Sequence, residues 1–208
     1  MPNHRLCLSA LTLLSALAFT HPTRADVQIT KSIRYFAIGG KTASELDQQL
    51  SNHGPLMRKT GARHPGATRI KFGGTVTYVE RNGKCAVGAA NVTLSTRLIL
   101  PRWANRRRAD KDLAFIWDTL SRDIKRHEER HAEIARNHAR AMEKTFLALH
   151  PESDCERMQA RLDRASADAI VAHDKDQARF DRVESANFND RMMRLLSYGL
   201  KSRQKLAN

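Results

Sequence analysis

Hydrophobic and polar positions follow two different periods in the two halves of the chain. Residues 26–38, 68–80 and 85–100 are rich in β-branched and aromatic residues, and 68–80 alternates apolar with polar positions as a strand does. The Asn82-Gly83 pair between the last two predicts a tight hairpin, because it tolerates positive φ. We expect a small antiparallel sheet here, with Gly73-Gly74 as the site of a bulge.

One short helix interrupts the strands. Thr42 and Glu45 have the spacing of a capping box, and Leu46 and Leu50 then lie on one helical face. Residues 52–66 contain three glycines and two prolines, which predicts a loop.

The second half has the period of long helices. Residues 109–149 contain no glycine or proline, and Asp110 is a suitable N-cap. Pro151 ends this helix, and a second one begins near Ser153 and continues through Phe188 on one apolar face. The predicted fold class is therefore α+β: a small N-terminal antiparallel sheet with one short helix, then a long antiparallel helical hairpin.

The N-terminus resembles a secretory signal. Arg5 precedes an apolar run over residues 6–19, and Ala25 ends an acceptable cleavage site. We expect residues 1–25 to be a signal peptide, 26–200 a single domain and 201–208 a polar tail. No later segment is apolar enough to span a membrane. This organisation predicts a periplasmic or secreted protein.

Charge and cysteine content add to this interpretation. The formal net charge is +14, and loss of Arg5 and Arg24 with the signal would lower it to +12. A basic surface suits acidic peptide or protein substrates or anionic envelope components, or merely solubility. No nucleic-acid-binding fold is recognisable, so nucleic acid is not an expected partner. Cys85 and Cys155 would remain, and in an oxidising compartment they predict a disulfide, with two buried thiols as the alternative.

The candidate chemistry lies on the long helix. His127-Glu128-Glu129-Arg130-His131 is an HExxH sequence, and both histidines fall on the apolar stripe. Residues four apart stack one turn apart, so both imidazoles can reach one Zn²⁺ ion. Glu128 lies about 100° round the helix, where it can act as general base towards water. The alternative is a charged helix exposed to solvent.

The third metal ligand should come from the second helix. If that helix folds back antiparallel, the middle of the motif faces residues near 175, which makes His173 the first candidate. Asp181 and Glu184 are alternatives, either as ligand or as partners that orient the histidine rings. His173 could instead be an ordinary helix-surface histidine. His138 lies about 10 Å further along the axis, too far for the same ion.

Several features taken together resemble a bacterial family of unknown function described as a predicted secreted zinc-dependent protease. The shared features, in order, are Tyr35-Phe36, Gly39, Thr42, Glu45-Leu46, Cys85, Leu100-Pro101, Trp103, the HExxH sequence, Ile134, Cys155, Gln177, Phe180 and Asp181. The resemblance implies a zinc site with peptidase chemistry. Two positions depart from it: Glu133 replaces an aspartate, and Arg182 to Asn187 lack the terminal histidine of the family pattern.

The expected function is thus zinc-dependent peptide-bond hydrolysis through a metal-activated water. A non-catalytic, zinc-binding and disulfide-stapled module of the cell envelope is the alternative. A third interpretation is a polyanion binder, whose affinity would fall steeply with salt and ignore mutation of His127. The sequence does not specify the substrate or the oligomeric state.

Overall fold

The structure is a computed structural model that describes residues 27–57 and 61–207. The expected signal peptide and its cleavage site lie outside the described residues. In chain order the elements are β1 (Gln28–Ile38), α1 (Ala43–His53), β2 (Ala67–Arg81), β3 (Lys84–Trp103), the 3₁₀ turn η1 (Arg106–Arg108), α2 (Lys111–Leu147), α3 (Cys155–Ala186) and α4 (Phe188–Ala207). The mixed α+β composition expected from the two periods is confirmed.

The strands form a mixed sheet of order β1-β3-β2. β2 and β3 are an antiparallel hairpin whose turn uses Asn82 (φ 52°) and Gly83 (φ 68°), as predicted. β1, however, pairs parallel to β3, so the expectation of an antiparallel sheet is wrong for this strand. The reason is topological: β1 occupies the far edge of β3 instead of pairing with β2, and the chain reverses direction twice between them.

The irregularity in β2 also differs from its predicted position. Pairing continues through Gly73 and Gly74, which face Thr93 and Val92, and the register shifts between Thr77 and Tyr78. An added Cβ at Gly74 would lie 2.2 Å from the Asn91 carbonyl oxygen. The glycine therefore permits a close backbone approach without a bulge.

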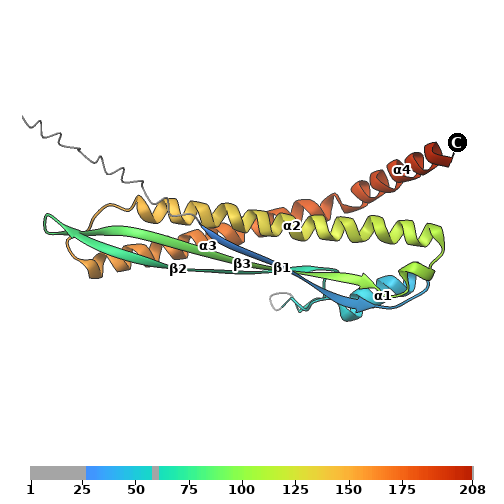
Figure 1. The fold of residues 1–208 in the computed structure, drawn as a ribbon, viewed down its shortest axis with the longest axis horizontal. Helices are drawn as coiled ribbons and strands as arrows, with labels where there is room; N and C mark the ends of the chain where they lie inside the picture. The colour runs from blue at the N-terminus through green and yellow to red at the C-terminus, as the bar shows by residue number, and fades with distance from the viewer. Residues whose placement is uncertain (1–26, 58–60, 208) are drawn as a thin grey trace, which may run out of the picture.

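The core lies between the sheet and α2. Alternate side chains of β3 face α2, including Val92, Leu94 and Leu98, all at most 4% exposed. They meet a stripe of alanines on α2, of which Ala135 and Ala139 are fully buried. Because alanine is small, the helix can lie close along the sheet for much of its length (Figure 1). This packing fixes which face of α2 points towards the sheet.

α3 runs back along α2, with Arg126 paired to Glu184 and His138 to Asp176. Residues 148–154 do not turn directly, because Glu152 first exchanges two backbone hydrogen bonds with Cys85 at the start of β3. The expected disulfide between Cys85 and Cys155 is present beside this bridge. It ties the sheet to the beginning of α3.

The second helix was expected to continue through Phe188, and this is corrected by a break at Asn187, which separates α3 from α4. α4 contacts α2 through Arg191, which donates to Asp123, and through Gly199, where an added Cβ would lie 2.5 Å from the Phe115 ring. Within residues 27–57 and 61–207, none of the helices combines the length and apolar character of a membrane span.

Candidate metal centre

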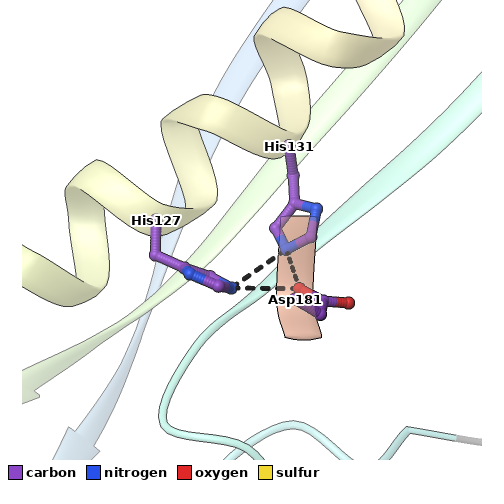
Figure 2. Close-up of side chains that lie close together, drawn as sticks. All are labelled: His127, His131 and Asp181. Carbon is purple, nitrogen blue, oxygen red and sulfur yellow. Dashed lines mark hydrogen bonds and ion pairs between the residues drawn. The ribbon is translucent and has the colours of Figure 1, made fainter. Parts of the chain in front are cut away.

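Two histidines of α2 and one aspartate of α3 converge on a point between the helices (Figure 2). His127 and His131 lie one turn apart, and their Nε2 atoms are 3.0 Å from each other. Asp181 Oδ1 lies 3.3 Å from His127 Nε2 and 2.9 Å from His131 Nε2. Each residue therefore directs one potential ligand atom towards the same position.

The three atoms have nearly the spacing that a tetrahedral zinc site needs. Zinc binds imidazole nitrogen and carboxylate oxygen at about 2.0–2.1 Å, so neighbouring ligand atoms of a tetrahedron are roughly 3.4 Å apart. The observed separations of 2.9 to 3.3 Å are slightly shorter. Two neutral imidazoles and one carboxylate also form a donor set typical of catalytic zinc, in which the fourth position takes water. The residues present fit the ion.

The electrostatics of the cluster favour a charged Asp181. Burial alone would raise its pKa, but hydrogen bonds from His127 and His131 lower it well below the ordinary value. For His131 burial favours the neutral ring, yet hydrogen bonds to Asp181 and Gln177 raise its pKa above 6.5. The Asp181 carboxylate and the His131 ring thus favour each other's charged form.

Gln177 orients the ring of His131. Its Oε1 accepts a hydrogen bond from His131 Nδ1, and its Nε2 donates to the His131 carbonyl oxygen at 3.1 Å. The remaining amide hydrogen points to His173 Nε2 at 2.8 Å. A proton fixed on Nδ1 leaves the Nε2 lone pair of His131 free to face the ion, which is the usual role of such outer partners.

His173 belongs to this supporting network. It is 6% exposed, its Nδ1 lies 3.2 Å from Asp174 Oδ1, and its ring packs edge-on against Phe72. Burial lowers its pKa, so the neutral form can accept the hydrogen bond from Gln177. His173 is thus not one of the three converging donors but is linked to His131 through Gln177. Asp181, the alternative named from the sequence, lies where the third donor converges.

His127 is supported on its other side by Glu184. Its Nδ1 lies 3.7 Å from Glu184 Oε2, and its ring stacks on Phe180 with centroids 4.8 Å apart. Glu184 is itself paired with Arg126 and with Arg191, the latter at 3.3 Å. Of the two alternatives named from the sequence, Asp181 joins the donors and Glu184 contacts the far nitrogen of a donor.

Glu128 lies beside the cluster and is 5% exposed. Its Oε2 accepts a hydrogen bond of 2.8 Å from Thr68 Oγ1, a residue of β2. Gly66 allows the chain to pass close by, since an added Cβ there would lie 2.9 Å from Glu128 Oε1. Burial raises the pKa of Glu128, although the Thr68 hydrogen bond and the two histidines oppose this. A carboxylate with a raised pKa is a stronger base.

Two clefts border the cluster. The larger, about 650 Å³, lies between the beginning of β2 and α3 and includes His131, Gln177 and Asp181 in its wall. The smaller, about 350 Å³, lies towards α4 and is bordered by Asp123, Ile124, Glu184, Ser185, Phe188 and Arg191. Both clefts also share four lining residues: His64, Gly66, His127 and Glu128. The candidate metal centre is therefore accessible from the surface.

Some residues that take part in the candidate site have no local signal in the sequence. Thr68 meets Glu128 across 60 positions and Arg191 meets Asp123 across 68, so only the assembled fold brings them together. The glycine-rich loop around His64 is compatible with a cleft but favours simple exposure, and in the structure His64 lines both clefts.

The fold and site together define an α+β protein in which two paired helices carry a His-His-Asp cluster beside a buried glutamate. The chain belongs to the family described as bacterial protein of unknown function (DUF922), which matches residues 33–188. The matched range contains all three donors and ends at the first residue of α4. No curated protein and no solved structure showed significant similarity to the chain.

Proposed function

We propose that this protein is a periplasmic or secreted zinc-dependent peptidase. One observation supports it above all: His127, His131 and Asp181 direct donor atoms to one point, immediately beside buried Glu128 and at the wall of an open cleft. A structural zinc site usually has four protein ligands, whereas a catalytic one has three and keeps a position for water. The basic surface suits acidic peptide segments.

The residues divide into binding and proton-transfer roles. His127 and His131 from α2 and Asp181 from the returning α3 would hold Zn²⁺, which supplies Lewis-acid polarisation of the scissile carbonyl and acidifies water. Glu128 accepts the proton of the attacking water and passes it to the leaving amine nitrogen. Thr68 holds the Glu128 carboxylate in place for both transfers.

The network around the ligands keeps this arrangement rigid. Gln177 fixes the tautomer of His131, and Glu184 lies against the far nitrogen of His127. Pre-organised outer partners of this kind typically change metal affinity or activity by about 10- to 100-fold when removed. The helical pairing is part of the proposal, because the third ligand comes from α3.

Metal content and peptide cleavage test the proposal separately. Purified mature protein should contain close to one zinc per chain, and His131→Ala should lose it. Glu128→Gln should keep zinc but lose cleavage by at least about 100-fold, as expected for a general base. Glu129→Gln is the matched control, since Glu129 is the adjacent carboxylate and pairs with Lys31.

The outcomes separate the interpretations. Zinc binding without cleavage of any peptide in a broad library would replace the peptidase by a non-catalytic zinc module of the cell envelope. Binding to anionic polymers that falls with salt and is unchanged in His127→Ala would instead favour a polyanion binder. Equal activity of Glu128→Gln and Glu129→Gln would refute the assigned mechanism.

A further inference from the structure

The two clefts at the candidate metal centre extend in opposite directions along the helix pair. The larger follows α2 towards His131 and α3 back towards Ile170. The smaller follows α2 back towards Asp123 and α3 forward to Ser185. His127 and Glu128 lie where the two meet. A bound chain therefore has space on both sides of the reacting position.

The larger cleft continues beyond the site. It shares Phe72 and Ile170 with a third cleft of about 450 Å³, which follows β2 to Tyr78 and α3 back to Gln159. None of the residues that line this third cleft carries a charge: the lining is formed by apolar side chains, glycines and neutral polar groups. The third and the larger cleft run along β2 and α3, and the smaller cleft continues along α2 and α3. The candidate metal centre lies within this path, where the larger and the smaller cleft meet.

An enzyme that removes terminal residues needs a charged group to hold the chain end. A free α-carboxylate requires a cation, but no lysine or arginine is among the described residues that line the larger cleft. In the smaller cleft Arg191 is already bound by Asp123 and Glu184. A new unpaired charge would be costly to bury there.

The carboxylates are engaged in the same way. Asp123 accepts hydrogen bonds from Arg126 and Arg191, and Glu184 pairs with both of these arginines. In the larger cleft Asp174 contacts His173 Nδ1. A free α-amino group would therefore meet carboxylates that already hold partners within the protein.

We propose that the site cleaves peptide bonds in the interior of an extended chain, as an endopeptidase, with apolar side chains preferred on the β2–α3 side. This inference rests on the proposed peptidase function and specifies its substrate class. The preference follows from Ile70, Phe72 and Ile170, which line that side of the path.

Internally quenched peptides with acetylated and amidated ends test the inference against the same peptides with free ends. The zinc-loaded full chain should cleave both sets at internal bonds, with kcat/KM within about tenfold of each other. Cleavage that requires a free terminus would overturn the inference and leave the peptidase standing. No cleavage of any peptide would refute the peptidase and the inference together.

Variants that narrow the path on one side of the candidate metal centre provide a second test. Ser185→Trp narrows the smaller cleft and Ser166→Trp the third one, whereas Ser202→Trp changes an exposed helical serine outside these clefts. Both narrowing variants should lower kcat/KM for a long blocked peptide by about tenfold or more, with zinc content unchanged. If only one of the two variants lowers kcat/KM for the long peptide, the substrate lies on one side of the candidate metal centre alone and the inference is wrong.

Discussion

Replacement of Asp181 by alanine, compared with His173→Ala, gives the most direct test of the site. Sequence spacing favours His173 as third ligand, whereas the structure brings the Asp181 carboxylate to the two imidazoles. Both residues lie on α3, so both variants change the same helix. The comparison therefore separates a ligand from a supporting residue.

The expected magnitudes follow from the contacts. Asp181 Oδ1 lies within 3.3 Å of both Nε2 atoms, so its loss removes a ligand and should weaken zinc binding by more than the roughly 100-fold upper range of outer-partner effects. His173 is hydrogen-bonded to Gln177, and Gln177 would keep its two bonds to His131 without it. We expect His173→Ala to weaken zinc binding by about tenfold or less. The two variants should therefore differ in the free energy of zinc binding by at least about 1.4 kcal/mol.

Competition with a chromophoric chelator at neutral pH measures these affinities, and the visible spectrum of the Co²⁺-substituted protein reports the ligand geometry. Asp181→Ala should change that spectrum, and His173→Ala should leave it nearly unchanged. Asp176→Ala is the control, since this exposed carboxylate of α3 binds His138 instead. A larger loss of affinity in His173→Ala than in Asp181→Ala would refute the ligand assignment.

Three further predictions concern stability and pH. Cys85→Ala with Cys155→Ala should lower the free energy of unfolding in urea by about 4 kcal/mol, because the bond closes a loop across 70 positions; an unchanged midpoint would contradict this. Arg191→Met removes one of the two guanidinium partners of buried Asp123 and should lower the free energy of unfolding by about 3 kcal/mol. The control Arg203→Met removes an exposed ion pair and should lower it by less than about 1 kcal/mol. Zinc affinity should rise with pH to beyond pH 6.5. Burial lowers the pKa of His131, but the hydrogen bonds of its ring raise this pKa above 6.5, and the proton must leave before the metal binds. A zinc affinity that stays constant between pH 6 and 8 would contradict this.

Local signals in the sequence predicted the elements well. Thr42 caps α1 by accepting from the Glu45 amide, and Asp110 caps α2 by accepting from the amides of Asp112 and Leu113. The Asn-Gly hairpin is also confirmed. Each of these caps and turns depends on a few neighbouring residues, so the local sequence is enough to predict it.

Long-range pairing was harder to predict. A hairpin sets the direction of two adjacent strands, but nothing local specifies that β1 lies on the far side of β3, and its parallel direction follows only from that choice. The facing positions of α2 and α3 depend similarly on residues 148–154. Their detour to the start of β3 places Asp181, six residues beyond position 175, opposite the two histidines.

α3 is fastened at both ends, by Cys155 at its beginning and, in the proposed holoenzyme, by zinc on Asp181 near its end. The first bond requires an oxidant and contributes about 4 kcal/mol, and a metal present at about 1,000 times its dissociation constant contributes a similar amount. A newly made chain that is still reduced and metal-free would hold this helix by side-chain packing, ion pairs and hydrogen bonds such as those of Gln177. Under the proposed function, such a chain would lack a completed catalytic centre until it had bound zinc.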